Sequence, residues 1–452
     1  MEEENFLAEV KQEEMKFVMD ALKWYVEQVD KNKSMNLQDF VNFMEPKFGQ
    51  AGYRTPARVG DKINVIMIHD AGTGDFVLQS ATIRELRRVY PEAYITLVVS
   101  GSAAQLAEFC PYVNEIVVNE QQYNPLDFLT ALKWDLVMAE RLLTRRYNVG
   151  YAFVHNPATA ALLYMSGTHH RVSHLFKEGE ETFPCHCNMP LRYAQNLCQH
   201  LLPMYDYGDH IVDGCLSLLE QGLHAPIANR ELEIWCTGLD FSTAKNLIGT
   251  ARRPLYAIVF GGNRLIKHYP PEKYAQVIKM IAQEEPTATF VILGGGSYDL
   301  NSAQILKENL GEKFFADNVI DLTNKTTYRQ TAVILGLCDM YIGNDTGALH
   351  TAAAVKCPCL AVFPFPADFP EQHMTDGFLL FRPYRVPSVV IQPAHAIGQC
   401  ARPKNEPYSP FGCRVLDEPH CIAQIEPSTI FKGFHILKEK IARKIIDTTY
   451  VY

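Results

Sequence analysis

The sequence contains no apolar run close to the roughly 18 residues that a transmembrane helix requires. The stretch from Met1 to Phe6 is acidic and lacks the basic segment and apolar core of a secretion signal. These two absences predict a cytoplasmic protein. A membrane-bound partner would then be met by peripheral contact at the membrane surface.

An excess of positive charge is also missing. The chain has 42 Lys and Arg against 51 Asp and Glu, which gives a formal net charge of −9. Proteins that bind nucleic acid neutralise phosphates with a broad basic surface. We therefore expect no nucleic-acid partner, although a local basic surface is still needed if the substrate is an anion.

Two cofactor signatures are absent as well. The twelve cysteines include no C-x-x-C pair, and several of them stand among apolar residues as buried thiols do, namely Cys110, Cys198, Cys215 and Cys338. A disulfide framework is not expected in a cytoplasmic chain. The triple glycine in Gly294-Gly-Gly-Ser-Tyr-Asp299 is not a G-x-G-x-x-G fingerprint, which argues against a dinucleotide-dependent dehydrogenase.

What the chain does contain is a regular alternation of short apolar runs and stretches of helical spacing. The predicted strands cover residues 63–68, 94–99, 115–118, 135–138, 255–260, 289–293, 319–322, 340–342 and 359–363. The predicted helices cover residues 77–89, 103–109, 126–132, 271–282, 303–310, 327–338 and 427–446, and residues 171–210 are left unassigned. This alternation is typical of βαβ units with a parallel sheet. We predict an α/β protein with two Rossmann-like domains, residues 59–225 and 226–452, and a ligand between them.

Residues 1–58 form a separate helical extension. Apolar residues fall on one helical face between Phe17 and Val29, and a second short helix is predicted from Leu37 to Met44, ending before Pro46. The extension could be a cap packed on the main body, a substrate-recognition element or an oligomerisation element. The residues do not choose between these alternatives.

The functional signal is strongest in Tyr341-Ile-Gly-Asn-Asp-Thr-Gly-Ala-Leu-His350. An apolar strand ends at Ile342, a turn follows, and a helix rich in alanine begins near Gly347. The free N–H groups and positive dipole of a helix N-terminus suit an anion such as a diphosphate. His350 lies about one turn into the helix and could face the same ligand. The alternative is an ordinary turn in which Asp345 caps the helix.

Asp345-Thr-Gly-x-x-His350, its alanine-rich helix and the preceding helix at residues 327–338 resemble the donor-site motif of glycosyltransferase family 9, the ADP-heptose:lipopolysaccharide heptosyltransferases. The resemblance implies a GT-B-like fold, with two Rossmann-like domains facing across a cleft. It also implies donor-binding roles for Asp345, Thr346, Gly347 and His350, with ADP-heptose as the donor. No cofactor is expected beyond that nucleotide sugar.

A second match lies in the loop Gly72-Thr-Gly-Asp75, after the first predicted strand. It resembles the Gly-Asp motif of the same family, in which this aspartate is the proposed catalytic base. Transfer with inversion requires a carboxylate that takes the proton of the attacking acceptor hydroxyl. The alternative is that Asp75 only caps a helix that starts near Phe76.

A third match is Gly262-Asn-Arg-Leu-Ile-Lys-His-Tyr-Pro270, which resembles the family segment whose lysine binds the donor phosphates. Lys267 matches that lysine, and its compact charge could offset negative charge on the departing ADP. Arg264 is a neighbouring cation. Without the family context, Lys267 would be a solvated loop lysine.

The chain departs from the family pattern at two places. Related enzymes often carry a glutamate for the ribose just after the glycine-rich loop, where this chain has Tyr298 and Asp299. Cys400, Cys413 and Cys421, with His395 and His420 close by, resemble the cysteine set that holds iron in some protein heptosyltransferases, and Cys185-His-Cys187 has the same ambiguity. Their irregular spacing keeps metal out of the predicted site.

The sequence thus predicts an inverting glycosyltransferase that transfers a sugar, heptose from ADP-heptose, to a lipopolysaccharide or other glycan acceptor, which can be lipid-linked. Asp75 would be its base, while Lys267 and the turn from Asp345 to His350 would hold the diphosphate. Two alternatives stay open. One is a protein O-heptosyltransferase with a cysteine-bound metal, and the other is a protein that binds nucleotide sugars without catalysis.

Overall fold

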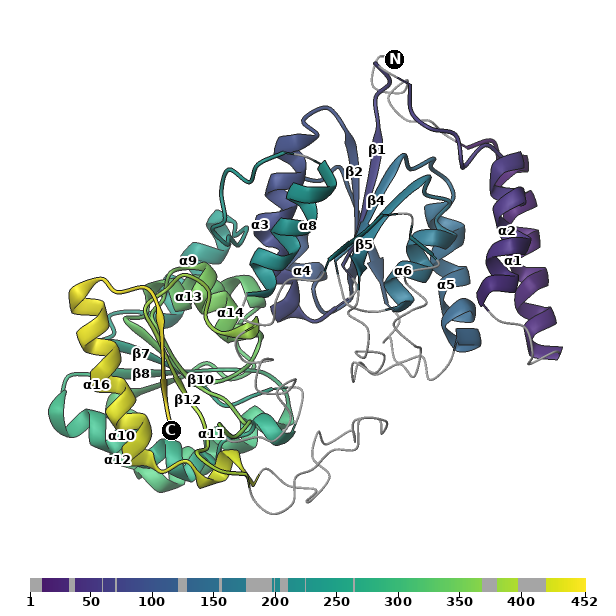
Figure 1. The fold of residues 1–452 in the computed structure, drawn as a ribbon. Helices are drawn as coiled ribbons and strands as arrows, with labels where there is room; N and C mark the ends of the chain where they lie inside the picture. The colour runs from purple at the N-terminus through teal and green to yellow at the C-terminus, as the bar shows by residue number, and fades with distance from the viewer. Residues whose placement is uncertain are drawn as a thin grey trace. The chain divides into compact units, whose positions relative to one another are not determined.

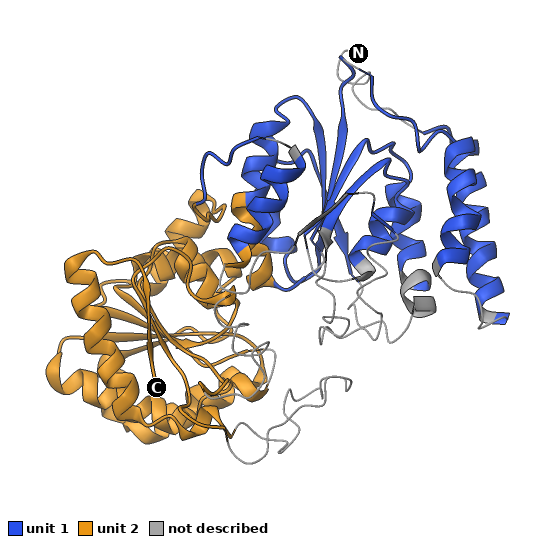
Figure 2. Ribbon diagram, viewed as in Figure 1, with its two compact units in different colours: residues 1–72, 82–205, 212–230 blue, residues 73–81, 206–211, 231–452 orange. Residues whose placement is uncertain are grey.

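The computed structural model of the 452-residue chain describes residues 10–31, 37–58, 60–69, 71–120, 128–153, 157–175, 197–198, 200–203, 210–223, 225–262, 265–367, 380–396 and 420–452. The chain forms two compact units (Figure 2). The first comprises residues 1–72, 82–205 and 212–230, and the second comprises residues 73–81, 206–211 and 231–452. Helix α3 (Thr73–Val89) therefore contributes its first half to the second unit.

The first unit is built on a parallel sheet of six strands in the order β3-β2-β1-β4-β5-β6 (Figure 1). The strands are β1 (Asn64–His69), β2 (Tyr94–Ser100), β3 (Glu115–Asn119), β4 (Val149–Ala152), β5 (His170–Leu175) and β6 (His200–Pro203). The central strand β1 is buried along its whole length because it pairs with β2 and β4 and is covered on both faces. The predicted strands around residues 63–68, 94–99 and 115–118 are confirmed.

The helices of the first unit are α3, α4 (Ala104–Ala107), α5 (Phe128–Leu142), α6 (Pro157–Met165) and α8 (Ile211–Leu223). The strand predicted at residues 135–138 is wrong, because these residues lie inside α5. Asp135 is fully buried there and Val137 is 64% exposed, the reverse of what a buried strand requires. The helix predicted at residues 126–132 and the strand predicted at residues 135–138 therefore belong to one helix, and the next strand of the sheet is β4.

The N-terminal extension is two helices, α1 (Gln12–Lys31) and α2 (Leu37–Gln50), of which α1 packs on α5 and on α2 (Figure 1). Leu22, Phe40 and Phe48 are completely buried and belong to the same hydrophobic core as α5 and α6. The prediction that the second helix ends before Pro46 is wrong. Burial of Phe48 beyond the proline outweighs the backbone hydrogen bond that a proline removes from a helix interior.

The second unit has a parallel sheet of seven strands in the order β13-β12-β11-β10-β7-β8-β9. Its strands are β7 (Leu255–Val259), β8 (Thr289–Leu293), β9 (Val319–Asp321), β10 (Met340–Asn344), β11 (Cys359–Val362), β12 (Ser388–Ile391) and β13 (Thr448–Val451). Counted from its first strand, this order repeats that of the first unit, with one strand added. The two Rossmann-like units of the fold prediction are confirmed, although β12 and β13 were not foreseen.

Helices cover both faces of this second sheet (Figure 1). They are α9 (Gly238–Ile248), α10 (Pro271–Glu284), α11 (Ser297–Leu310), α12 (Glu312–Asn318), α13 (Tyr328–Leu337), α14 (Gly347–Ala354) and α16 (Pro427–Arg443), with single 3₁₀ turns η2 (Leu265–Lys267) and η3 (Ile422–Gln424). Phe290 and Ile292 of β8 face one core, and Val291 and Leu293 face the other, as the two-residue period of a strand demands. Because all neighbouring strands of this sheet are parallel, their carboxyl ends lie at one edge of it.

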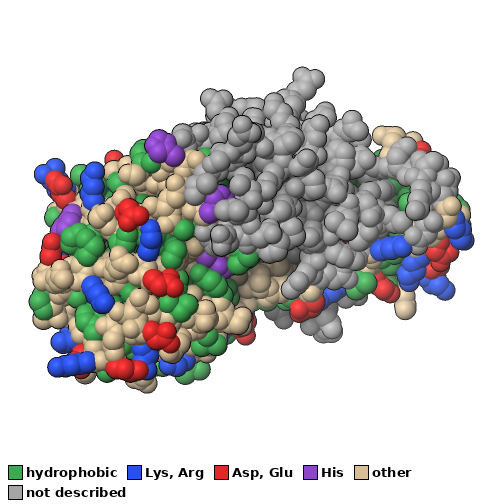
Figure 3. All heavy atoms as spheres, turned by 90° about the horizontal axis from the view of Figure 1, so that it is seen from below, with side chains coloured by type: hydrophobic (Ala, Val, Ile, Leu, Met, Phe, Trp, Pro, Cys, Tyr) green, Lys and Arg blue, Asp and Glu red, His purple; other side chains and the backbone are tan. Residues whose placement is uncertain are grey.

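Helix lengths and surface charge give two general constraints. Among the described residues, no helix is both long enough and apolar enough to cross a membrane. On the described surface visible in Figure 3, basic and acidic side chains are interspersed. In contrast, the charged side chains of Lys267 and Asp345 lie together at the carboxyl edge of the second sheet and are largely buried.

Candidate active site

The turn between β10 and α14 is built around Asn344, the last residue of the strand. The hydroxyl of Tyr274 donates to Asn344 Oδ1 at 2.8 Å, and that of Tyr341 donates to the Asn344 carbonyl at 2.6 Å. The N-cap of α14 is Thr346, whose hydroxyl accepts from the N–H of Ala348. The alternative in which Asp345 caps this helix is therefore wrong, and the Asp345 side chain is used for something else.

Asp345 forms an ion pair with Lys267, which lies 78 residues earlier in η2. The Lys267 ammonium donates to Asp345 Oδ2 at 2.6 Å, and the two side chains are 21% and 10% exposed. Lys267 follows β7 and Asp345 follows β10, two neighbouring strands of the sheet. The pair thus stands where the strand order reverses, the point at which open α/β sheets bind ligands. Lys267 is not the solvated loop lysine of the alternative interpretation.

His350 completes what we call the lysine cluster: Lys267, Asp345 and His350. Its Nε2 lies 4.0 Å from Asp345 Oδ1, and its side chain is 7% exposed. Burial lowers the pKa of His350 to about 4, so the ring is neutral at pH 7. Its Nδ1 is buried and has no hydrogen-bond partner among the described residues. An atom of this kind is a place where a ligand could form a hydrogen bond.

The first turn of α3 meets the first turn of α14 within the second unit. A Cβ atom on Gly74 would lie 2.8 Å from His350 Cδ2 and 2.9 Å from the Gly347 Cα, so neither helix could approach the other if residue 74 had a side chain. Asp75 is the third residue of α3, and the N-cap position of this helix is occupied by Gly72. The alternative in which Asp75 caps the helix is therefore wrong. Two helix N-termini with their positive dipole ends are brought to one place.

In the glycine-rich turn after β8, two backbone N–H groups are already hydrogen-bonded to nearby side chains. The N–H of Gly295 donates to Asp299 Oδ2 and that of Gly296 donates to Asn324 Oδ1, each at 2.7 Å. A Cβ atom on Gly261 or Gly294 would lie within 2.7 Å of the Asp299 carboxylate. These glycines make room for a buried side chain, and the amides of Gly295 and Gly296 do not cradle a phosphate.

Asp299, which the sequence marked only as a departure from the family pattern, is buried in this turn. It is 5% exposed, and its Oδ1 has no hydrogen-bond partner among the described residues. Burial raises its pKa to about 6, against the opposing effect of the hydrogen bond from Gly295. The signal that could have found it is the triple glycine itself, because consecutive glycines after a strand leave space that a first-turn carboxylate can fill.

Several predicted groups lie outside the described residues, namely Cys185, Cys187, Arg264, Cys400 and Cys413. Cys421 is described and half-buried. Among the described residues, no group of three or more His, Cys, Asp or Glu is placed to hold a metal ion. The cysteine-bound metal of the alternative prediction therefore stays a prediction.

The arrangement can be compared with known proteins. The sequence profile of glycosyltransferase family 9 (heptosyltransferase) matches residues 197–366. Lipopolysaccharide heptosyltransferase 2 of Escherichia coli (strain K12) is 22% identical over 313 residues, covering 68% of this chain and 84% of that protein. The family match includes Lys267 and the whole stretch from Asp345 to His350.

Two solved structures are similar over most of their length. A glycosyltransferase family 9 protein from Veillonella parvula superposes with a TM-score of 0.61 and 17% identity, covering 85% of this chain and 100% of that one. The E. coli ADP-heptose lipopolysaccharide heptosyltransferase II has a TM-score of 0.57 and 18% identity, covering 84% and 100%. The GT-B-like fold class is confirmed by these similarities. Together with the sequence matches, they identify the chain as a glycosyltransferase whose sequence is similar to that of glycosyltransferase family 9 (heptosyltransferase) over residues 197–366.

Proposed function

We propose that the protein transfers heptose from ADP-heptose to a glycan acceptor with inversion at the anomeric carbon. The donor assignment rests on what the relatives' names state, since the E. coli structure is that of an ADP-heptose enzyme. The observation that carries the proposal is the lysine cluster. It combines a cation, a buried imidazole with an unused nitrogen and a helix N-terminus at one sheet edge.

Each part of this cluster suits one part of the donor. The Lys267 ammonium and the N–H group of Gly347 at the start of α14 would bind the diphosphate, because both present positive charge. His350 would donate or accept a hydrogen bond through Nδ1 as a neutral ring. The Asp345 carboxylate would repel phosphate. We therefore assign it two other roles, the ion pair with Lys267 and a hydrogen bond that it accepts from a hydroxyl of the sugar.

Asp75 would act as the general base. The acceptor oxygen attacks the anomeric carbon while the bond from that carbon to the diphosphate oxygen breaks, and the proton of the acceptor hydroxyl passes to the Asp75 carboxylate. ADP leaves with an additional negative charge, which Lys267 and the N-terminus of α14 stabilise. The contact between Gly74 and Gly347 supports this assignment, since it brings the first turn of α3 to the donor helix.

The acceptor is proposed more broadly as a lipopolysaccharide or other lipid-linked glycan, bound by the predicted domain of residues 59–225, with the donor bound by residues 226–452. A lipid-linked acceptor requires the protein to work at the cytoplasmic face of the inner membrane. Curated relatives named for lipopolysaccharide support this choice.

Two measurements on the same preparation test the function. First, ADP-heptose should raise the melting temperature more than UDP- or GDP-sugars do, because a ligand far above its dissociation constant stabilises the folded state. Second, ADP should be released only when donor and a lipopolysaccharide core acceptor are both present. Binding without ADP release for any glycan acceptor would indicate a nucleotide-sugar-binding protein without catalysis. Preference for a different nucleotide would overturn the donor assignment.

A further inference from the structure

The segment between α8 and α9 is not a free linker. Its first part, within the first unit, is bound to the C-terminal half of α3. Arg88 donates to the Pro226 carbonyl at 2.6 Å, and the Glu85 carboxylate accepts from the N–H groups of Ala228 and Asn229 at 2.9 and 3.2 Å. Glu85 is 1% exposed. A buried carboxylate thus satisfies two backbone donors of a segment that has no secondary structure of its own.

The second part of the segment, within the second unit, is bound to the N-terminal half of α3. The N–H of Glu233 donates to Ser80 Oγ at 3.0 Å. The ring of Trp235 packs edge-on against Phe76, with centroids 6.1 Å apart and planes at 74°. Ser80 and Phe76 are 1% and 2% exposed. We call residues 226–235 the strap.

The strap runs antiparallel to α3, from residue 88 of the helix towards its start. The helix residues that hold it are four positions apart, which puts them on one face: Phe76, Ser80, Arg84 and Arg88. The last anchor, Phe76, is the immediate neighbour of Asp75. The strap therefore ends beside the residue to which the reaction assigns proton transfer.

On the opposite side, the first turn of α3 rests on α14 through the contact between Gly74 and Gly347, with no side chain between the two backbones. A contact between two glycines restrains distance but offers little surface to resist rotation of the turn. The aromatic pair supplies that surface, because offset and edge-on rings have a preferred geometry. The turn is thus held between α14 and Trp235.

We propose that Trp235 and Ser80 are positioning residues for Asp75, fixing the first turn of α3 so that the carboxylate keeps a constant position relative to α14. The effect on turnover rests on the proposed role of Asp75 as the base, whereas the effect on the turn does not. A misplacement of about 1 Å can lower a rate about 100-fold without touching the chemistry.

The test compares Trp235→Leu, which removes the ring, with Trp235→Phe, which keeps an aromatic edge. Glu231→Gln is the matched control, since Glu231 lies in the same strap and pairs with Lys356 and Arg385. We expect Trp235→Leu to lower kcat about tenfold or more while the Kd for ADP stays within twofold. Trp235→Phe should recover most of the rate, and Glu231→Gln should match the parent.

Hydrogen exchange of the amides of residues 76–80, the first ones bonded within α3, gives a readout that does not depend on turnover. It should speed up in Trp235→Leu and in the milder Ser80→Ala, and stay unchanged in Glu231→Gln. Hydrogen exchange that is unchanged in both Trp235→Leu and Ser80→Ala overturns the proposal. Where the parent is active, a kcat of Trp235→Leu within twofold of that of the parent overturns it as well. If the parent itself releases no ADP, the proposed function fails while the exchange data still decide the role of the strap.

Discussion

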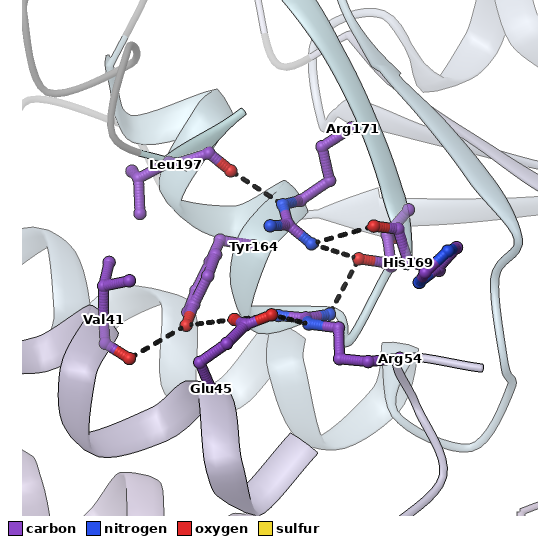
Figure 4. Close-up of polar contacts among 8 residues, drawn as sticks. Val41, Glu45, Arg54, Tyr164, His169, Arg171 and Leu197 are labelled. Carbon is purple, nitrogen blue, oxygen red and sulfur yellow. Dashed lines mark hydrogen bonds and ion pairs between the residues drawn. The ribbon is translucent and has the colours of Figure 1, made fainter. Parts of the chain in front are cut away.

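Each unit buries a charged cluster, and the two clusters differ in how fully their polar atoms are paired. The first unit contains the arginine cluster: Glu45, Arg54, Tyr164 and Arg171 (Figure 4). Arg54 Nε donates to Glu45 Oε1 at 2.9 Å, and the Tyr164 hydroxyl donates to Glu45 Oε2 at 2.8 Å. Arg54 Nη2 also donates to Glu45 Oε2 at 3.3 Å. Other guanidinium bonds go to main-chain carbonyls, including that of Thr168, which accepts from both arginines.

The lysine cluster of the second unit is the opposite case. Among the described residues, the Lys267 ammonium has one hydrogen bond for its three protons, and His350 Nδ1 has none. Buried polar groups normally find partners, so a buried nitrogen such as His350 Nδ1 without one among the described residues is a place where a ligand could bind. The arginine cluster fastens α2 to α6 and β5, whereas the lysine cluster is the place at which we propose that the donor binds. In this protein, pairing is the property in which the two clusters differ most.

The largest expected effect is that of Asp75→Asn, which leaves both clusters intact. Asn has nearly the same size, but it cannot accept the proton of the acceptor hydroxyl, a role worth a factor of about 10²–10⁴ in rate. We expect turnover, followed as ADP release, to fall by that factor while ADP affinity and melting temperature stay close to those of the parent. Turnover within a few-fold of the parent would reject the base assignment.

Breaking the arginine cluster should reduce stability and leave binding unchanged. Arg54→Leu removes charge-assisted bonds to Glu45 and Thr168, and because Glu45 is 42% exposed we expect a loss of about 2–3 kcal/mol in the free energy of unfolding. Arg54→Lys should recover part of this, since a lysine cannot reproduce the forked contact. Urea unfolding gives the stability, and ADP titration on the same protein should be unaltered. A large loss of ADP affinity would contradict the purely structural role.

Breaking the lysine cluster should do the reverse. Lys267→Ala removes a charged partner of the diphosphate, and ADP affinity should weaken by about 1.5–3 kcal/mol. The single variant also leaves the buried Asp345 carboxylate without its cation and should melt lower than the parent. Adding Asp345→Asn should restore the melting temperature but not the affinity. If the double variant binds ADP as the parent does, Lys267 serves only to neutralise Asp345.

These contrasts also explain what the sequence could predict. Strands β1, β7 and β10 were found because a central parallel strand is a continuous apolar run, a local pattern. The helix α5 was misassigned around residues 135–138 because a short apolar run fits a strand or a helix equally well, and only packing decided. The turn at Asp345 was recognised from its motif, whereas its pairing with Lys267 joins residues 78 positions apart and leaves no local trace.

The strap was missed because its anchors are backbone N–H and carbonyl groups, which every residue carries and no sequence pattern marks. Asp299 stood out in the sequence only as a departure from the family pattern, and its burial became visible when Gly261 and Gly294 were seen to leave space for its carboxylate. Function was better predicted than mechanism, because motifs are local and contacts are not.

The smallest expected effect is a pH dependence of stability from Asp299, a buried group of the second unit that, like His350, has an unused polar atom. Burial raises its pKa in the folded protein to about 6, from an ordinary value of 3.8. The folded state therefore holds this proton more tightly than the unfolded state, and the carboxyl group destabilises the protein increasingly as the pH rises from about 4 through 6. Asp299→Asn cannot ionise, so its stability relative to the parent should improve by roughly 1–2 kcal/mol between pH 4.5 and 7.

Asp240 provides a control for that measurement. Burial alone would raise its pKa, but hydrogen bonds from Thr237 and the guanidinium of Arg329 outweigh burial and lower it. Folding therefore favours its ionised form, and this contribution is present above the unfolded pKa of about 4 and is lost only as the pH falls below that value. The stability of Asp240→Asn relative to the parent should therefore stay nearly constant between pH 4.5 and 7, while that of Asp299→Asn improves. Urea unfolding of both variants at pH 4.5 and 7 separates the two cases, because a general effect of pH would change both differences alike. A stability difference between Asp299→Asn and the parent that does not change with pH would mean that Asp299 is ionised in the folded protein as readily as in the unfolded chain.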